Sequence, residues 1–418
     1  MKNKQVLSPE ELFGTAIGLQ APWHIDKIEY EQNGESPSIS VLHLHLSYDP
    51  GYSFEDSVGN RCPIYDHVKR KWRHLNFFQH ECYIYADVPR ITTTEGKVTT
   101  IEVPWARPGS SFTLLMEAYC MTIARSGMSL PQVGRLVGLD SRVIGRMIGH
   151  AVEEGLEKTP LEQVKQLSID ETSSKKGHNY ITILSDAKEK KVVGIGVGRN
   201  KEAVLAGIQE MEVRGSKASE VAEVAIDLSP AYTSAALEYF ERASIVYDRF
   251  HVEQLLSKAL DTVRKIERKE CSQLRNTKYM WLRNYRDLKE EDQRIVEYLS
   301  NLYPTIGKAY QLKEQFKEVW EQSSAEKGIR VLRAWLHMAK QSKLQPIMAF
   351  VKTLESHWSG IITYFKSRLN NGYAERLNLV IQEIKRRGRG YRNMENFMRM
   401  IYFHCGKLCL PIYPLKMA

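Results

Sequence analysis

The chain contains little cysteine and no long hydrophobic run. Only 6 of its 418 residues are cysteines, and only Cys405 and Cys409 lie close together, which suits a reducing compartment better than a disulfide framework. No stretch is apolar for long enough to span a bilayer, and no apolar segment follows the N-terminal Met-Lys-Asn-Lys, so no signal peptide is expected. Internal repeats and low-complexity tracts are also absent. We therefore expect a cytoplasmic protein without a membrane partner.

Charge is the most informative part of the composition. Hydrophobic residues make up 43% of the chain and charged residues 26%, which is ordinary for a globular protein with a sizeable core. The length allows roughly two to four domains. The 59 Lys and Arg residues outnumber the 50 Asp and Glu residues, and the net charge is +9. This balance favours a polyanionic partner, with nucleic acid as the expected one.

Residues 1–108 are predicted to form a β-rich domain. Two segments that alternate apolar and polar side chains flank Asn33-Gly34, and this dipeptide is a strong hairpin signal. The clearest strands are expected at residues 23–30, 39–46 and 81–88.

Residues 109–160 change to a helical periodicity. A short helix, a tight turn and a further helix follow a longer first helix, which is the pattern of a helix-turn-helix reader of DNA; three-helix bundles without a DNA role share this pattern. Ser141 is expected to cap the last helix. Arg142, Arg146 and His150 recur every four residues and share one face, and we predict Arg142 and Arg146 as DNA contacts. The helices are expected at residues 112–125, 130–137 and 142–154.

Three strands followed by alternating helices and strands are expected in residues 161–252. Simple doubly wound sheets do not usually open with two hairpins, so this order predicts a ribonuclease H-like fold of mixed α/β class. Residues 253–365 show no strand pattern and are rich in Lys, Arg, Glu and Leu, which predicts a helical insertion. Residues 366–418 are expected to complete the ribonuclease H-like domain that this insertion interrupts. The strands are expected at residues 164–170, 180–184, 191–197, 221–227 and 243–247, and the helices at 201–211 and 230–242.

Three carboxylates carry the functional prediction. Asp170 and Asp227 each end an apolar strand, and Glu375 lies near the start of a basic helix. Carboxylates delivered to one place from strand ends and a helix suit a pair of Mg²⁺ ions, or Mn²⁺, that drives phosphodiester chemistry. The spacing of 57 residues (227 − 170) suits two central strands, and the helical insertion explains the following 148 (375 − 227). Taken singly, each acid is better explained as a turn-former or helix cap, but their joint placement favours the metal site.

Asp248 and His251 form a second cluster directly after the fifth expected strand. At positions i and i+3 of a helix start they share one face. They could orient a catalytic carboxylate, contact the scissile phosphate or cap the helix. We predict a supporting role near the metal ions, with Asp248 as the replacement candidate for Asp227.

Two basic clusters are predicted to contact DNA. The first surrounds Trp72 in the β-rich domain, and the second begins ten residues (385 − 375) beyond Glu375, where it could hold phosphates near the site of cleavage. Either cluster could instead be a solvated basic face. Their members are Lys69, Arg70, Lys71 and Arg73, and Lys385, Arg386, Arg387, Arg389 and Arg392.

Six short segments carry a resemblance to a known family. They are SIDE at 168–171, IDLSPAY at 226–232, DRFHV at 248–252, NGYAERLN at 371–378, IKRR at 384–387 and GYRNMENF at 390–397. With these segments, the chain resembles the ISL3 family of bacterial insertion-sequence DDE transposases over nearly its whole length, and the last two segments are the most specific.

The resemblance implies that Asp170, Asp227 and Glu375 are the metal-binding triad, with Asp248 and His251 as the accessory motif. It implies a nucleoid-associated protein that binds double-stranded DNA at the terminal inverted repeats of its element. Strand cleavage and transfer to target DNA would follow, in a homodimeric synaptic complex. A catalytically silent DNA-binding protein or repressor is the alternative, and a nuclease without end specificity is a third possibility.

One departure concerns zinc. The family usually carries a zinc ribbon near the N-terminus, but the places of its paired cysteines hold Glu55 with Val58, and Thr92 with Glu95. Valine cannot ligate zinc and threonine rarely does, so the four-thiolate site is absent. We therefore expect a degenerate ribbon-like domain in which zinc is unlikely; Cys62 and Cys82, with His74 or His80, are the only irregular alternative.

Overall fold

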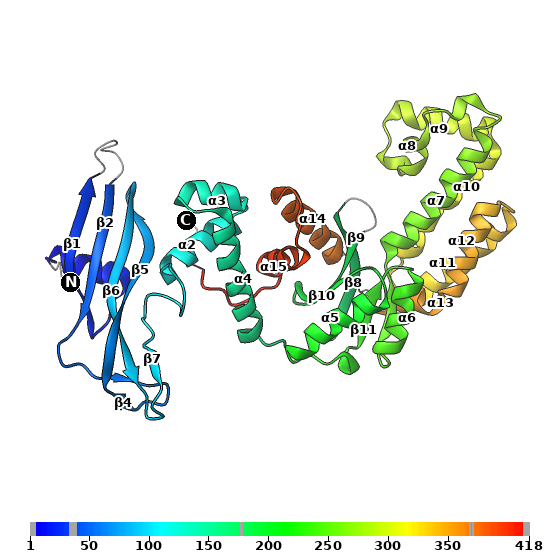
Figure 1. The fold of residues 1–418 in the computed structure, drawn as a ribbon. Coiled ribbons are helices and arrows are strands. Elements are labelled where there is room, and N and C mark those ends of the chain that lie inside the picture. Colours follow the sequence, from blue (N-terminus) through cyan, green and yellow to red (C-terminus); the bar gives the residue numbers. More distant parts are fainter. Residues whose placement is uncertain (1–5, 33–39, 176–178, 368, 370–371, 413–418) are drawn as a thin grey trace. The chain divides into compact units, whose positions relative to one another are not determined.

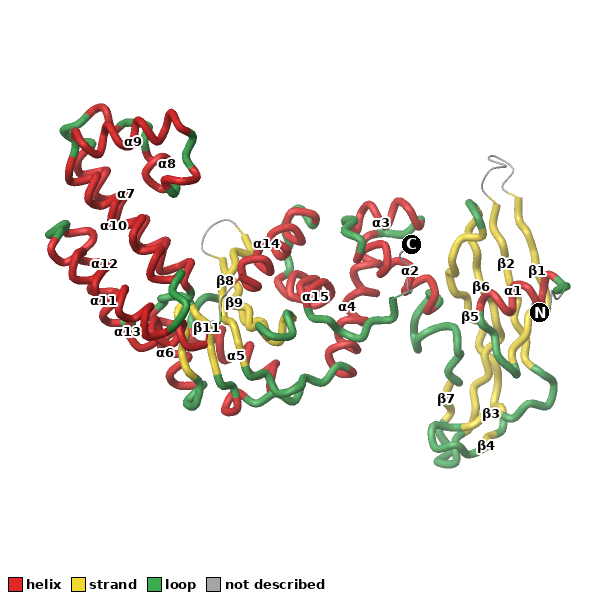
Figure 2. The backbone as a smooth tube through the Cα atoms, turned by 180° about the vertical axis from the view of Figure 1, so that it is seen from behind, coloured by secondary structure: helices red, strands yellow, loops and turns green. Residues whose placement is uncertain are grey.

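The computed structural model describes residues 6–32, 40–175, 179–367, 369 and 372–412. The chain divides into two compact units, one with residues 1–155 and 409–418 and the other with residues 156–408. Figure 2 shows the strands and helices of each. No helix in the described part is both long and apolar enough to cross a membrane.

The first unit opens with a helix and a five-stranded sheet. The strand order is β1-β2-β6-β5, with β7 paired to β6, and only β2 and β6 run parallel. Leu42, Leu44 and Leu46 are buried and alternate with half-buried residues along β2, so one face of the sheet covers the core. The predicted strands are confirmed where they are described; Asn33-Gly34 and residue 39 lie outside the described residues. The elements are α1 (Pro9–Ile17), β1 (Trp23–Gln32), β2 (Ser40–Tyr48), β3 (Phe54–Glu55), β4 (Arg61–Cys62), β5 (Ile64–Phe77), β6 (His80–Thr92) and β7 (Val98–Thr100).

Three helices complete this unit: α2 (Leu114–Arg125), α3 (Leu130–Val137) and α4 (Ser141–Lys158). Gly138 ends α3 with a φ of 71°, a conformation that glycine adopts without strain. Asp140, rather than Ser141, caps α4, since its Oδ1 accepts the backbone N–H of Arg142 at 2.7 Å. The prediction of Ser141 as the cap was therefore wrong by one residue, because the helix starts at Ser141 itself.

The second unit contains a five-stranded mixed sheet in the order β10-β9-β8-β11-β12 (Figure 1). The first three strands are antiparallel neighbours, and β11 runs parallel to both β8 and β12. Gly194 and Gly196 let α5 lie against β10, because a Cβ at either position would clash with the helix backbone at Gly207 or Ala203. The elements are β8 (Gln166–Lys175), β9 (Asn179–Asp186), β10 (Lys191–Val197), α5 (Lys201–Val213), β11 (Glu223–Ile226), α6 (Pro230–Tyr239) and β12 (Ser244–Tyr247).

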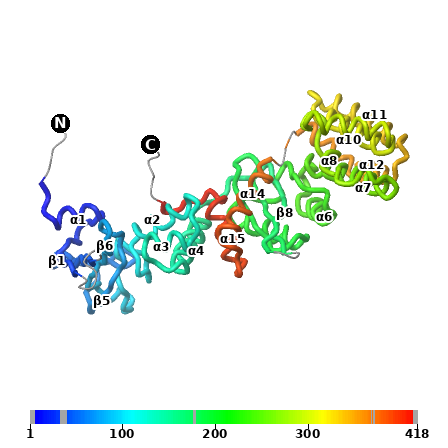
Figure 3. The backbone as a smooth tube through the Cα atoms, turned by 90° about the horizontal axis from the view of Figure 1, so that it is seen from above, coloured from blue at the N-terminus to red at the C-terminus, as the bar shows by residue number. Residues whose placement is uncertain are grey.

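Helices alone follow β12 in the described chain, as predicted for residues 253–365. Helices α7, α8, α10, α11 and α12 gather on one side of the sheet, whereas α14 and α15 lie on the other (Figure 3). Helix α10 links two hydrophobic cores. Ile306 and Tyr310, early in α10, pack in one core with Trp281, whereas Phe316 and Trp320, later in α10, belong to the core of the sheet. The helices are α7 (Arg249–Glu267), α8 (Lys278–Leu282), α9 (Glu290–Leu302), α10 (Pro304–Trp320), α11 (Ala325–Gln341), α12 (Gln345–Ser356), α13 (Trp358–Ser367), α14 (Gly372–Arg387) and α15 (Met394–Cys405).

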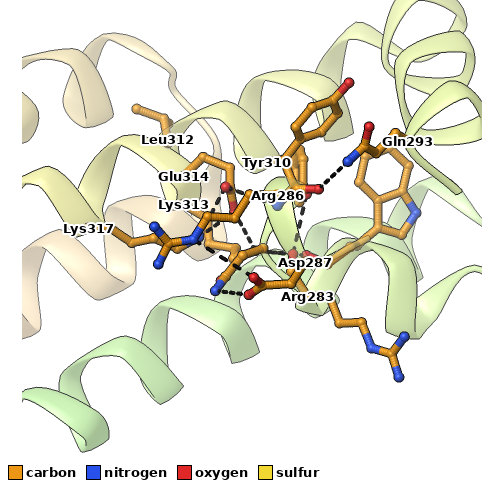
Figure 4. Close-up of polar contacts among 12 residues, drawn as sticks. Arg283, Arg286, Asp287, Gln293, Tyr310, Leu312, Lys313, Glu314 and Lys317 are labelled. Atoms are coloured by element: carbon orange, nitrogen blue, oxygen red, sulfur yellow. Dashed lines mark hydrogen bonds and ion pairs between the residues drawn. The ribbon is translucent and has the colours of Figure 1, made fainter. Parts of the chain in front are cut away.

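A buried lysine fixes the loop between α8 and α9 to α10 (Figure 4). The Nζ of Lys313 donates to the carbonyl of Arg283 at 2.6 Å and to Oε1 of Glu314 at 2.8 Å. Glu314 in turn accepts the backbone N–H of Tyr285 at 3.1 Å. Desolvation lowers the pKa of Lys313, but the neighbouring carboxylate and carbonyls are the partners that a buried ammonium needs.

Candidate active site

Asp170, Asp227 and Asp248 stand at one level of three adjacent strands. Ser168 of β8 pairs with Ala225 of β11, and Ala225 pairs with Val246 of β12, all in parallel. Each aspartate comes two residues after one of these paired residues: Asp170 within β8, and Asp227 and Asp248 directly after the ends of β11 and β12. Because neighbouring strands lie about 4.8 Å apart, the fold brings together acids that are 57 and 21 residues apart in the chain (227 − 170, 248 − 227).

Asp170 is half-buried and held at both carboxylate oxygens. Its Oδ1 accepts the backbone N–H of Glu171 at 2.8 Å, and its Oδ2 accepts Nδ2 of Asn378 at 2.8 Å. Desolvation raises the pKa of Asp170 to about 7, and the nearby charges of Glu171 and Asp248 act in the same direction. A carboxylate in such surroundings gains from a bound cation.

Asp227 follows β11 and is half-buried. Its Oδ1 accepts the backbone N–H of Ser229 at 2.8 Å, directly before α6. The helix-start role considered from the sequence is therefore present, but it occupies only one of the carboxylate oxygens. Desolvation raises the pKa of Asp227, and the charges of His251 and Arg199 lower it.

Asp248 caps α7, since its Oδ1 accepts the backbone N–H of Phe250 at 3.1 Å. His251 Nε2 lies 3.7 Å from Oδ2 of the same aspartate. The charge of His251 lowers the pKa of Asp170, Asp227 and Glu375 alike. The histidine is therefore within electrostatic range of all three members of the predicted triad, and the supporting role of this pair stays a prediction.

Glu375 lies in the first turn of α14 and is exposed. Desolvation and the charge of Asp248 raise its pKa. Its helix lies along β8, because Asn378, Gln382 and Lys385 all donate hydrogen bonds to residues 170–173.

The site has the donors for a hard divalent cation. Among the described residues, no Lys or Arg forms an ion pair with Asp170, Asp227 or Glu375, so no side-chain cation neutralises these charges by direct pairing. The described part of the chain contains no group of three His, Cys, Asp or Glu side chains that could hold one ion. Mg²⁺ usually takes one or two carboxylates and completes its shell with water and substrate phosphate, and the row of aspartates fits that mode.

Sequence reasoning missed three residues of this region: Glu171, Asn378 and Arg199. Glu171 is half-buried, and its Oε2 has no hydrogen-bond partner within the described chain. The guanidinium of Arg199 lies over the ring of Tyr180, 5.0 Å from its centroid, and its charge lowers the pKa of both Glu171 and Asp227. Glu171 had a signal in the sequence, since it is adjacent to Asp170, and Asn378 ends the segment NGYAERLN that carries the family resemblance. Arg199 had no such signal.

The predicted DNA contacts in the first unit separate into exposed and buried residues. Lys69, Lys71 and Arg146 are exposed, as is Arg142, which pairs with Asp140 at 3.1 Å; Arg70 is half-buried. Arg73 is only 5% exposed.

The prediction for Arg73 needs correction. Its guanidinium donates to the carbonyls of His74 and Cys82, and to Oδ1 of Asn76 at 2.5 Å. Its backbone also pairs with the chain at Ser111 and Thr113. This segment runs parallel to β5 at Arg73. The guanidinium is buried and occupied by protein acceptors, so it is not placed to contact DNA.

Some residues of the C-terminal basic cluster already form hydrogen bonds or ion pairs within the chain. Lys385 is half-buried and donates to the carbonyl of Ser173 at 2.8 Å, and desolvation lowers its pKa. Arg386 and Arg387 both pair with Glu383. Arg389 and Arg392 are exposed, and they remain the members of this cluster with the freest access to a phosphate.

Asp56 connects the two turns where a zinc ribbon would hold its metal. Its carboxylate accepts the backbone N–H groups of Val58 at 3.1 Å and Asn60 at 2.9 Å, and Oγ1 of Thr94 in the second turn at 3.4 Å. The Sγ of Cys62 lies 3.7 Å from Oδ2 of the same residue.

The other residues considered for an irregular zinc site are engaged elsewhere. His74 contacts Thr113, and His80 contacts the backbone N–H of Ser40 and the hydroxyl of Tyr30. Cys82 is buried, and desolvation raises its thiol pKa to about 12. The structure therefore does not bring these side chains together with Cys62.

Comparison with protein families gives three matches. A model described as "Transposase" (DDE, ISL3) matches residues 167–401, one described as the helix-turn-helix domain of transposase family ISL3 matches residues 101–152, and a zinc finger of the transposases of IS204, IS1001, IS1096 and IS1165 matches residues 59–92. The last match removes the support for our expectation that zinc is unlikely, because the segment is similar to a zinc finger.

Similarity to two transposases covers about nine-tenths of the chain. The transposase for insertion sequence element IS1001 of Bordetella parapertussis is 24% identical over 397 residues, which cover 92% of this chain and 96% of the relative. The transposase for IS1557 of Mycobacterium tuberculosis is 21% identical over 415 residues, with 91% and 92% covered.

Proposed function

Because the chain belongs to the ISL3 family of DDE transposases, we propose that it binds the terminal inverted repeats of an insertion sequence and catalyses metal-dependent DNA strand cleavage and strand transfer. The observation that carries this proposal is the row of Asp170, Asp227 and Asp248 at one level of the sheet, with Glu375 on the helix beside it. The order of antiparallel and parallel strands supports a ribonuclease H-like fold.

Asp170, Asp227 and Glu375 would hold Mg²⁺, or Mn²⁺ in its place. When bound, such ions activate an oxygen nucleophile and stabilise the charge that develops on the phosphate. The chain's own residues prepare this place. Partial burial keeps the carboxylates of Asp170 and Asp227 poorly hydrated, and Asn378 and backbone N–H groups fix their orientation. Asp248 with His251 would support the site from the start of α7.

DNA binding in this proposal uses two exposed regions of the first unit. In the helix-turn-helix, Arg142 and Arg146 on α4 would reach a groove or the backbone, and Lys69, Arg70 and Lys71 on β5 would contact phosphates. Near the active site, Arg389 and Arg392 would hold the cleaved strand, and target DNA would be bound in the same complex. Since two ends must be joined, we propose a homodimer as the synaptic unit.

Cleavage of a labelled duplex that carries the cognate end tests the proposal. The wild-type protein should nick this duplex in Mg²⁺ and leave a scrambled duplex uncut. Asp170→Ala and Glu375→Ala should abolish cleavage and joining but retain end binding in Ca²⁺, measured by mobility shift. Unchanged cleavage by both variants would falsify the assignment, and a wild-type protein that binds ends without cutting them would instead indicate a repressor.

A further inference from the structure

Asn378 is the residue of α14 that contacts the first aspartate directly. Its Nδ2 donates to Oδ2 of Asp170 at 2.8 Å and lies 3.5 Å from the carbonyl oxygen of Glu171. The other carboxylate oxygen, Oδ1, accepts the backbone N–H of Glu171. A carboxylate that is held at both oxygens cannot turn about its Cβ–Cγ bond without losing a hydrogen bond, so its plane is fixed by these two donors.

The same face of α14 connects Asn378 to the rest of the site. Glu375 lies three residues before it, on the same stripe of the helix. After it, Gln382 donates to Oγ1 of Thr172 at 2.5 Å, and Lys385 donates to Ser173. These hydrogen bonds fasten α14 to β8 and thereby fix the position of Glu375 relative to Asp170.

An asparagine suits this position chemically. Each carboxylate oxygen has two lone-pair directions, so one donated hydrogen bond leaves the second direction open for a cation. A Lys or Arg in the same place would orient the carboxylate but would also neutralise it, and would compete with a divalent ion. Asn378 carries no charge, and the carboxylate that it holds has no Lys or Arg partner in the described chain.

We propose that Asn378 is a positioning residue, which holds the Asp170 carboxylate in the orientation that receives a divalent cation. The inference rests on the proposed function and deepens it, because it names the residue that prepares the first metal ligand. It assigns Gln382 a different task, which is to fasten the helix to the strand without touching a carboxylate.

Metal binding by the full-length protein tests this role without any cleavage. Mn²⁺ is titrated into protein freed of divalent ions, and the free ion is followed by electron paramagnetic resonance. Asn378→Ala should weaken Mn²⁺ binding roughly 10- to 100-fold, the range for residues that orient a metal ligand. Gln382→Ala is the matched control from the same stripe; it should lower the melting temperature and leave the Mn²⁺ affinity unchanged within about twofold.

Equal weakening in Asn378→Ala and Gln382→Ala would overturn the inference, since both residues would then only fasten the helix. Wild-type affinity in Asn378→Ala would overturn it as well. Should the alanine variant fail to fold, Asn378→Leu fills the same volume without a donor, and the same loss is expected.

Asp170→Ala is the reference that separates the two proposals. If Asp170→Ala binds Mn²⁺ as the wild type does, the proposed metal site itself is wrong. If Asp170→Ala loses binding and both Asn378 variants retain it, only the role of Asn378 is wrong.

Discussion

Asp227 and Asp248 extend from neighbouring parallel strands at the same level, because Ile226 pairs with Tyr247. The backbone N–H of Asp248 also donates to the carbonyl of Ile226 at 3.0 Å. Either of these two carboxylates is placed to act as the second metal ligand beside Asp170. The sequence alone favoured Asp227 and kept Asp248 in reserve, and the geometry makes the choice between them an experimental one.

Substitution by asparagine separates the two aspartates. Asn caps a helix about as well as Asp, so Asp248→Asn should keep α7 intact and reduce end cleavage only about tenfold. Asp227→Asn should reduce cleavage by about 10³-fold or more, because a lost metal ligand removes several kcal/mol of transition-state stabilisation. Single-turnover cleavage rates measure both, and the reverse order of effects would transfer the ligand role to Asp248.

The first unit should lose stability in acid because of His74. Burial lowers the pKa of His74 to about 4, and its Nδ1 lies 2.9 Å from Oγ1 of Thr113, the cap of α2. Between the ordinary histidine pKa of about 6.5 and about 4, the unfolded chain binds a proton that the folded chain does not. The stabilisation is therefore complete above about pH 6.5 and is lost as the pH falls toward 4, by roughly 3 kcal/mol.

Urea unfolding of the full-length chain at pH 7.5, 6 and 5 measures this effect. His74→Asn keeps a polar group near Thr113 but cannot titrate, so the variant should show a smaller decrease in stability across this range. An identical decrease in the two proteins would mean that His74 is protonated in the folded state.

Lys313 should stabilise the helical insertion. Lys313→Met removes the donor to the carbonyl of Arg283 and leaves Glu314 with one cation fewer, and loss of one partner from a buried charged group costs about 3 kcal/mol. Lys308→Met, on the exposed side of α10, is the control and should change stability by no more than about 0.5 kcal/mol. Thermal unfolding followed by circular dichroism compares them; equal melting temperatures would contradict a structural role for Lys313.

Arg146 should contribute to DNA affinity through α4. Arg146→Ala is expected to weaken binding of the element's end and, if the guanidinium contacts a phosphate, to reduce the slope of log K against log salt by about one. Arg125→Ala removes the same charge from an exposed position at the end of α2. Fluorescence anisotropy over a series of salt concentrations measures the affinity of both variants for the end. Equal losses of affinity in Arg146→Ala and Arg125→Ala would mean that only the net charge matters.

Much of the architecture was readable from residue patterns. Alternating or continuously apolar runs predicted the strands of the second sheet and three strands of the first, but not β5 or β7. The apolar runs that end at Asp170 and Asp227 predicted the edge of the sheet at which the acids lie. The boundaries proposed for the five domains stay predictions. The burial of Arg73 could not be predicted, because it depends on a segment nearly 40 residues later that pairs with β5 in parallel.

The partner of Asp170 could not be predicted for a similar reason. Asn378 is 208 residues away in the chain, and its role depends on how α14 lies along β8. No local sequence pattern predicts how a helix aligns with a strand that is so distant in the chain. Sequence reasoning found the acids, whose positions at strand ends are a local property, and missed the neutral residue that orients one of them.

The helical insertion begins and ends at the same strand. It leaves through α7 directly after β12, and it returns through α13, where Gly360 lies so close to Tyr247 of β12 that a Cβ would stand 2.5 Å from the ring. A segment whose two ends are anchored side by side can lengthen, shorten or be exchanged during evolution without displacing the helix that carries Glu375. Relatives of very different size could thus keep the same chemistry.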